Sequence, residues 1–294
     1  MAKAATAPKI RLREILCATD FSDHSVSVLA HAAAIARRYR SKLYVAHVIP
    51  TDVYRSVPAE VMAEALKQTR GYVQDAMRNQ LALDFLQRVP NESVVREGSV
   101  ASELLKLADE LKAALLVIGT RAQHGLERLL QGSVAEEVFR QAPCPVLIVP
   151  PEAGEESGIP IRTVLFPTSF SENSLRAAPY AFSLARRHRA QLILLHVVLE
   201  NISTSPEDLA RLRSANEQRL RALVPTTNGS AREPSFCVEF GPVPERIVRV
   251  AVENDTDLIV LGIATAGVAA AHLAEGDAYR VVGAAPCPVL TIRG

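Results

Sequence analysis

The stretch EILCATDFSDHSVSVLAHAAAIARRYRSKLYVAHVI, residues 14 to 49, decides the fold because the chain repeats it. Residues 163 to 198, TVLFPTSFSENSLRAAPYAFSLARRHRAQLILLHVV, align with it without a gap at an offset of 149, and 13 of 36 positions are identical. A second block, residues 118 to 149 against 261 to 292, has an offset of 143 and carries the run APCPVL in both copies. A period near half the chain is too long for solenoid repeats of roughly 20 to 50 residues, so the pattern predicts two copies of one domain.

Length and composition agree with two ordinary globular domains. The chain has 294 residues, enough for two domains of roughly 145 each. Its 33 basic and 32 acidic residues balance, which argues against a surface dedicated to nucleic acid or an anionic membrane. The N-terminus lacks the apolar core of a signal peptide, and no apolar run reaches the roughly 18 residues of a membrane span. We therefore expect a cytoplasmic protein with no nucleic-acid or membrane partner.

Each copy alternates short strands with longer helices. In the first copy, we expect strands at 14–19, 42–49, 93–97, 114–119 and 144–149, and helices at 22–40, 59–89, 101–112 and 133–141. The apolar stripe of the first helix recurs in the second copy, as Leu29, Ala32, Ile35 and Ala36 against Ala178, Ala181, Leu184 and Ala185. Such alternation predicts right-handed βαβ units. The fold class is therefore α/β, with two doubly wound five-stranded parallel-sheet domains at 10–150 and 161–294, joined by a linker at 151–160.

The last strand of each copy is expected to lie at a sheet edge. Prolines bracket it at 143 and 145, and again at 286 and 288, and proline cannot donate to a strand ladder. An apolar edge strand requires a cover. The most economical cover is the edge strand of the other copy, which predicts that the two copies pair about a pseudo-two-fold axis within one chain. A homodimer of whole chains stays open.

Polar residues stand where the first strand of the first copy ends. In doubly wound sheets, ligands bind at the carboxyl ends of the strands, where the strand order reverses. The strand ends at Ala18, Thr19 and Asp20, which puts a carboxylate where it can bond a ribose hydroxyl. The same carboxylate can instead cap the following helix, since Asp is favoured at helix N-caps.

A second group of candidate residues follows the fourth strand, which ends at Gly119. The last helix of the copy begins at Gly132, Ser133 and Val134, and its free N–H groups and partial positive charge suit an anion. An ordinary helix start would have the same residues. The loop before the helix adds positive charge from Arg121, His124 and Arg128, although solvated loop positions account for these residues more simply. Together these features favour a nucleotide whose phosphates lie on the last helix.

On these residues the chain resembles the universal stress protein A family, specifically its tandem-domain members. The resemblance rests on TDFS after the first strand, AHVI and LHVV on the second, IGT on the fourth, GSVAEEV at the last helix and APCPVLIV at the end. The ATP-binding members carry the pattern G-x2-G-x9-G-[ST]. Gly119, Gly132 and Ser133 match it, and Ala122 stands at the second glycine, where a positive φ would cost about 1 to 2 kcal/mol.

The resemblance implies a ligand and a set of contacts. The ligand is ATP, with or without Mg²⁺ bound through its phosphates. Asp20 would face the ribose, the Val48 backbone the adenine, and the start of the last helix the phosphates. The residues expected to hold the nucleotide are Ala18, Thr19, Asp20, Val48, Gly119, Arg121, Ala122, Gly132, Ser133 and Val134.

The second copy keeps the fold pattern and loses the site. Ser169 stands at the Asp20 position, and Glu275 stands at the Gly132 position. A carboxylate about 4 Å from a phosphate charge costs roughly 4 kcal/mol at an effective dielectric near 20, or about a thousandfold in affinity. We therefore expect nucleotide in the first copy only.

No catalytic motif stands out in the sequence. It has no GxxxxGK[ST] P-loop, no HExxH and no GxSxG elbow, and the repeated His47 and His196 point to a structural role because they recur in the copy without a site. We expect an ATP-binding stress or regulatory module with little or no hydrolysis. Two other classes stay open: a structural or interaction protein without nucleotide, and an enzyme of the wider adenine-nucleotide α-hydrolase-like superfamily, although no SGGxDS-type loop follows the first strand.

An isolated first copy should expose its last strand. A fragment that ends near residue 152 is expected to dimerise or aggregate, because residues 144 to 149 would lose the cover provided by residues 287 to 292. Analytical ultracentrifugation of the fragment beside the full chain checks this. A monomeric fragment as stable as the full chain would show that the second copy is not a built-in partner.

Overall fold

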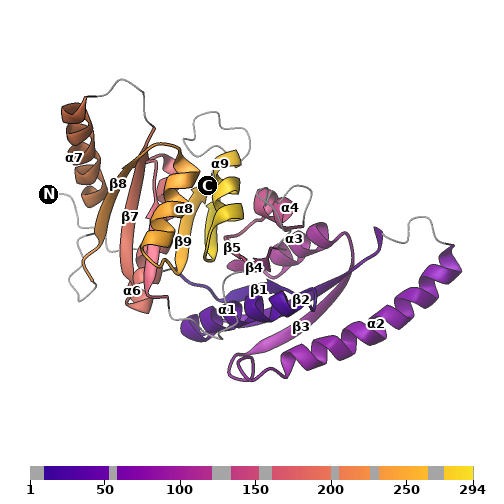
Figure 1. The fold of residues 1–294 in the computed structure, drawn as a ribbon. Helices are drawn as coiled ribbons and strands as arrows, with labels where there is room; N and C mark the ends of the chain where they lie inside the picture. The colour runs from indigo at the N-terminus through magenta and orange to yellow at the C-terminus, as the bar shows by residue number, and fades with distance from the viewer. Residues whose placement is uncertain are drawn as a thin grey trace. The chain divides into compact units, whose positions relative to one another are not determined.

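The computed structural model describes residues 10–52, 58–120, 134–151, 161–199, 205–225, 232–263 and 275–293, which form two α/β halves (Figure 1). Among the described helices, none is both long and apolar enough to cross a membrane. The two halves repeat one arrangement, as the internal repeat predicts, and each is a five-stranded parallel sheet with helices on both faces.

The sheet of the first half has the strand order β3-β2-β1-β4-β5. Its strands are β1 (Glu14–Ala18), β2 (Lys42–Pro50), β3 (Asn91–Gly98), β4 (Leu115–Gly119) and β5 (Val146–Val149). All neighbouring pairs are parallel. The chain moves outward from β1 to β3 and then crosses back to β4, so the strand order reverses between β1 and β4. This confirms a doubly wound sheet, and it places the reversal beside the ends of β1 and β4.

The helices of the first half cover both faces of its sheet. They are α1 (Asp23–Tyr39), α2 (Ala59–Leu81), α3 (Val100–Glu110) and α4 (Val134–Gln141). Right-handed crossovers that run in opposite directions place their helices on opposite faces. Accordingly α1 and α2 share one face, while α3 and α4 share the other and pack against each other.

The second half repeats this topology with the order β10-β9-β6-β7-β8. Its strands are β6 (Thr163–Pro167), β7 (Gln191–Val198), β8 (Ser235–Phe240), β9 (Leu258–Ile263) and β10 (Val289–Arg293). Its helices are α5 (Glu172–Arg176), α6 (Ala178–His188), α7 (Pro206–Ala222), α8 (Val243–Glu253) and α9 (Glu275–Ala284). The strand order here reverses between β6 and β9, which are paired.

The helix expected at 59–89 is shorter than its apolar spacing suggested. It ends at Leu81, and residues 82 to 89 form successive turns closed by bonds from Leu83 N to Gln80 O, Leu86 N to Leu83 O and Val89 N to Leu86 O. Each bond joins residues three positions apart. The apolar residues Leu83, Leu86 and Val89 therefore recur at nearly the spacing of a helical turn. Leu86 and Val89 are buried in this way without a helix.

A proline divides the first helix of the second copy, which α1 forms without a break in the first. Pro179 lies at the start of α6, and Ala177 separates α5 from α6. Proline has no N–H to donate and clashes with the carbonyl four residues before it, so a helix restarts at this position. The apolar stripe is displaced there: Ala181, Leu184 and Ala185 are buried as expected, but Ala178 is only half-buried.

Prolines also shorten the final strands. β5 begins at Val146 rather than at Cys144, and β10 begins at Val289. The carbonyls of Pro145 and Pro288 still accept bonds from Leu116 N and Ile259 N. The nitrogens of these two prolines carry no hydrogen and cannot donate to the neighbouring strand. Regular strand pairing, in which residues both donate and accept, therefore starts one residue later.

A glycine at the same aligned position lets a helix approach the sheet in each half. Gly119 ends β4, and a Cβ there would lie 2.8 Å from both His24 Nε2 and Val28 Cγ2 on α1. His24 uses this space to bond the Val149 carbonyl at 3.2 Å. Gly262 in β9 is tighter, because its Cβ would lie 2.2 Å from the backbone oxygen of Asn173 on α5. Gly119 therefore has a packing role whether or not a ligand binds.

Gly262→Ala should destabilise the protein more than Gly119→Ala. The first substitution drives a methyl group into helix backbone and is expected to cost about 3 kcal/mol, near the upper end for overpacking. The second meets side chains that can rotate, at the loss of the His24 bond, worth about 1 kcal/mol. Urea unfolding of the full chain measures both. Gly71→Ala in α2, where no atom lies within 4 Å of the added methyl, is the control and should stabilise slightly. Equal stability of Gly262→Ala and the wild type would contradict the packing argument.

Candidate functional site

The candidate site is built on a strained turn that follows β1. Phe21 has a φ of 62°, in the left-handed region that a bulky side chain rarely adopts. Its N–H donates to the Thr19 side-chain oxygen at 3.1 Å. Ser22 then caps α1, with its side chain accepting from Ser25 N. The strain is held by contacts on both sides of the turn, as expected for a strained residue that persists in a fold.

A histidine of β2 fixes this turn from the neighbouring strand. His47 Nδ1 donates to the Thr19 carbonyl at 2.8 Å, and its ring stacks on Phe21 with a centroid distance of 4.3 Å. Burial lowers the pKa of His47 below its usual value of 6.5, against the opposing effects of the Thr19 hydrogen bond and the Asp20 carboxylate. The bond requires a proton on Nδ1, which the neutral ring supplies when its other nitrogen, Nε2, is unprotonated. The contacts explain why the histidine is repeated.

Asp20 is exposed at the tip of this turn. Its Oδ1 accepts from Ser22 N at 3.1 Å and from Ser22 Oγ at 2.5 Å. The alternative that Asp20 is the N-cap of α1 is wrong, since the N-cap is Ser22. Asp20 instead closes a side-chain turn that orients its carboxylate at the carboxyl edge of the sheet, beside the point where the strand order reverses.

Thr19, in contrast, is buried and faces inward. Its hydroxyl donates to Gln80 Oε1 on α2 at 2.8 Å and lies 3.2 Å from Ser25 Oγ. Gln80 is also buried, and its amide lies 3.4 Å from Ser25 Oγ. This network ties α1 and α2 to the strand tip. Sequence reasoning missed Gln80 and His24, because a single polar residue on an amphipathic helix carries no signal of the distant group that it bonds.

The other expected site residues lie around this edge where the structure describes them. Ala18 is half-buried and pairs with Ala46 of β2, Val48 is buried in β2, and Val134 is the partly exposed first residue of α4. Because α4 carries the chain back from the end of β4, its N-terminus lies at the same edge of the sheet as Asp20. The remaining expected contacts, Arg121, Ala122, Gly132 and Ser133, lie outside the described residues.

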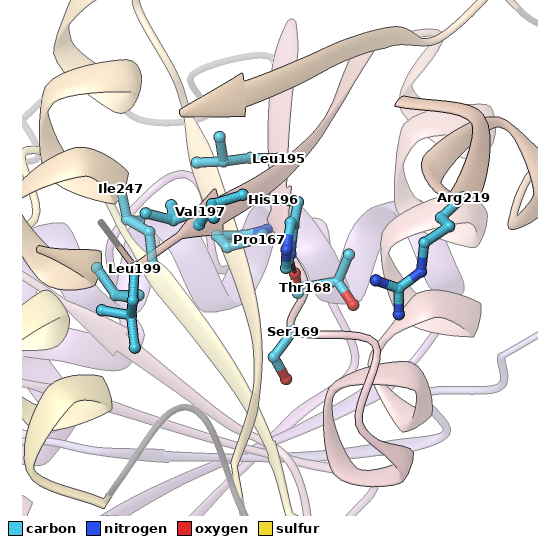
Figure 2. A pocket seen from close by; sticks show the side chains of 11 residues that line it. Pro167, Thr168, Ser169, Leu195, His196, Val197, Leu199, Arg219 and Ile247 are labelled. Atoms are coloured by element: carbon cyan, nitrogen blue, oxygen red, sulfur yellow. Dashed lines mark hydrogen bonds between the residues drawn. The ribbon is translucent and has the colours of Figure 1, made fainter. Parts of the chain in front are cut away.

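The second copy repeats the turn with different side chains on it. Phe170 also has a φ of 62°, and His196 Nδ1 donates to the Thr168 carbonyl at 2.8 Å. Ser169 replaces the carboxylate, and its hydroxyl lies 2.9 Å from Ser171 Oγ. The Arg219 guanidinium of α7 stacks over the Phe170 ring at 3.9 Å. A cavity of about 270 Å³ opens beside these residues (Figure 2).

The stability of the first copy should fall as the pH drops below neutrality. Burial is the main cause of the lowered pKa values of His31 and His47, so just below pH 6.5 the unfolded chain binds protons that the folded chain does not. The urea concentration at which half of the full-length protein is unfolded should therefore be lower at about pH 5.5 than at about pH 7.5. His47→Asn, which keeps a donor near the Thr19 carbonyl, should reduce the difference. A midpoint difference that is unchanged in this variant would contradict the assignment to His47.

Comparisons with known proteins match the two copies of this chain separately. The model of the universal stress protein family matches residues 11–150 and again 160–293. A universal stress protein of Methanocaldococcus jannaschii is 35% identical over 143 residues, which are 47% of this chain and 81% of the relative. One from Thermus aquaticus is 33% identical over 138 residues, 47% of this chain and 98% of the relative.

A solved structure resembles the whole chain. The universal stress protein from Archaeoglobus fulgidus DSM 4304 superposes with a TM-score of 0.68 over 97% of this chain and 99% of that one, at 20% identity. This likeness shows the fold of both copies. The family match covers nearly the whole sequence in two successive blocks, so the chain belongs to the universal stress protein family and carries two copies of its domain.

Proposed function

We propose that the protein is a nucleotide-binding regulatory module of the stress response, with ATP held in the first copy only. The observation that carries this proposal is the Asp20 carboxylate, which is exposed and oriented by Ser22 at the reversal of strand order. A carboxylate there accepts hydrogen bonds from ribose hydroxyls, and the start of α4 at the same edge suits phosphates. Gly132 and Ser133, which match the family's ATP-binding pattern, precede α4.

The second copy supports the asymmetry. The same turn presents Ser169 in place of Asp20, so a charged acceptor is replaced by a hydroxyl already engaged with Ser171. Glu275 stands in sequence where Gly132 stands in the first copy. Both changes disfavour a nucleotide bound in the family's mode.

We propose little or no turnover of ATP by this site. Phosphoryl transfer requires cations that stabilise the transferred group and a residue that positions its acceptor. The sequence has no P-loop lysine. Among the described residues of the strand tip, Thr19 and His47 are committed to bonds that hold the turn. The chemistry of the site therefore favours retention of nucleotide over its hydrolysis.

One competing function has a specific observation behind it. Gly119 is accounted for by the passage of His24, and Thr19 by its bonds to Gln80 and Phe21, so two expected site residues have structural reasons to be present. A structural or interaction protein that binds no nucleotide would keep them as well. Asp20 is the residue that separates the two functions, because its exposed carboxylate is not needed to cap α1.

Calorimetric titration of the full chain with ATP should give a stoichiometry near one. Gly132→Glu should weaken binding by about a thousandfold, because a carboxylate would stand beside the phosphates. Asp20→Ser should weaken it by roughly tenfold to a hundredfold, the worth of hydrogen bonds to a charged acceptor. Asp23→Ser, an equal change of charge on an exposed residue three positions away, is the control and should leave the affinity unchanged.

Two equivalent sites in this titration would contradict the asymmetry between the copies. The absence of any saturable heat with ATP would support the structural function instead. Unchanged affinity in Gly132→Glu would place the phosphates elsewhere, and formation of ADP at a steady rate would contradict the proposal of little turnover.

A further inference from the structure

The described part of the second copy contains a cavity at the place that corresponds to the proposed nucleotide site of the first copy, since its lining residues Thr168, Ser169 and Val197 align with Thr19, Asp20 and Val48. It lies at the carboxyl ends of β6 and β7 and is closed on one side by α8 (Figure 2). Its volume is about 270 Å³, near the lower end of the roughly 300 to 1,000 Å³ of pockets that enclose drug-sized ligands. The cavity therefore suits a small ligand.

One end of the cavity is apolar. Leu195 and Ile247 are fully buried behind it, Val197 and Val243 continue the wall, and Leu199 stands at the rim with 61% of its surface exposed. Figure 2 shows Val197, Leu199 and Ile247 gathered on one side of the cavity. An exposed leucine beside an apolar hollow favours a ligand with a hydrophobic body, because burying apolar area contributes about 25 cal/mol per Å².

The opposite end carries a positive charge. The guanidinium of Arg219 reaches this end from α7 and lies on the side of Thr168, away from the apolar group (Figure 2). None of the described lining residues is acidic, and no described carboxylate is ion-paired with Arg219. The charged end therefore favours an anionic group on the ligand.

The direction of the guanidinium is set by the protein itself. Arg219 Nη1 donates to Asn216 Oδ1 at 3.0 Å, and Arg219 Cζ lies over the Phe170 ring, 3.9 Å from its centroid. Asn216 is buried, and its own amide donates to the Leu212 carbonyl at 3.0 Å. A cation held in this way loses less conformational freedom when it binds an anion. One Nη1 bond leaves further N–H donors of the guanidinium for a ligand.

The first copy differs at both positions that set this charge. Its strand tip has the Asp20 carboxylate where the second copy has Ser169. Its Phe21 packs beside an apolar cluster of Ile49, Leu66 and Val73, where Phe170 instead meets Arg219. The second copy has thus lost a negative charge and gained a positive one on a turn of the same shape. Loss of nucleotide binding alone would explain the missing carboxylate. It would not explain the guanidinium of Arg219 over the Phe170 ring.

We propose that the cavity of the second copy binds a small carboxylate with an aliphatic body, the carboxylate against Arg219 and the body against Val197, Val243 and Leu199. Arginine is suited to carboxylates because its planar fork bonds both oxygens. The anion lies on the α7 side of the turn, whereas the family's mode would place phosphates at the start of the last helix. This proposal is independent of nucleotide binding in the first copy.

Octanoate is the probe for this site, and the full chain is the protein to titrate. Isothermal calorimetry should show saturable binding with a stoichiometry near one. Arg219→Gln should weaken binding by about tenfold, the worth of one charge-assisted hydrogen bond at a partly exposed site. The matched control is Arg221→Gln, since Arg221 stacks over Phe236 on the same helix at 4.4 Å but does not line the cavity. The control should bind octanoate as the wild type does.

A second variant distinguishes the loss of a ligand contact from a loss of folding. Ser169→Asp restores the residue of the first copy on a turn that already accommodates it there, so the fold should survive, and circular dichroism checks this. The new carboxylate repels or neutralises the charged end, so octanoate binding should again fall by about tenfold or more. 1-Octanol, which has the same body without the charge, should bind more weakly than octanoate and should not respond to Arg219→Gln.

Three results would overturn the proposal. They are the absence of saturable binding at millimolar octanoate, equal affinity of the wild type and Arg219→Gln, and displacement of octanoate by ATP in the wild type. The last result would make the cavity part of a nucleotide site. A failure of ATP to bind in the first copy, with octanoate still bound and sensitive to Arg219→Gln, would refute the proposed nucleotide function and leave this inference standing.

Discussion

A hydrogen bond from a histidine to the carbonyl at the tip of the first strand is the constraint on which the turn of each copy depends. His47 and His196 each donate from Nδ1 at 2.8 Å, and each ring lies against a phenylalanine held at a φ of 62°. A bulky residue in the left-handed region costs of order 1 to 3 kcal/mol and persists only where its surroundings hold it. The turn so fixed decides where the preceding side chain, Asp20 or Ser169, stands at the sheet edge.

Because the turn is common to both copies, the difference between them is a matter of a few side chains. In the first copy, a carboxylate oriented by Ser22 stands at the sheet edge. In the second, a hydroxyl takes its place and a guanidinium lies over the neighbouring ring. The two strand tips therefore differ in local charge while they keep the same backbone turn. The tandem arrangement gives one chain two strand tips of the same shape that differ in charge.

The strand and helix order could be predicted from the sequence because β-branched runs alternate with amphipathic stretches at regular intervals. The predicted ends of helices were wrong where turns kept the apolar spacing of a helix, or where a proline interrupted a helix. The turns after Leu81 bury Leu86 and Val89 at helical spacing without a helix, and Pro179 restarts a helix that the aligned copy runs through.

Side-chain contacts of long sequence separation were not predicted. His24 reaches the Val149 carbonyl 125 residues away, and Arg219 meets Phe170 from a helix whose sequence signals only solvent exposure. Such contacts follow from strand order and helix packing, which no window of sequence contains. The place of Asp20 just after the first strand could be predicted, because the pattern of apolar runs defines where that strand ends.

The division of ligands between the two copies can be tested in a single measurement. Native mass spectrometry of the full chain with ATP and octanoate present together counts the molecules bound to each chain. The expected species carries one nucleotide and one carboxylate at the same time, because the two sites lie on different copies and share no residue. A chain that carries two nucleotides, or on which each ligand excludes the other, would contradict the assignment of different chemistry to the two copies.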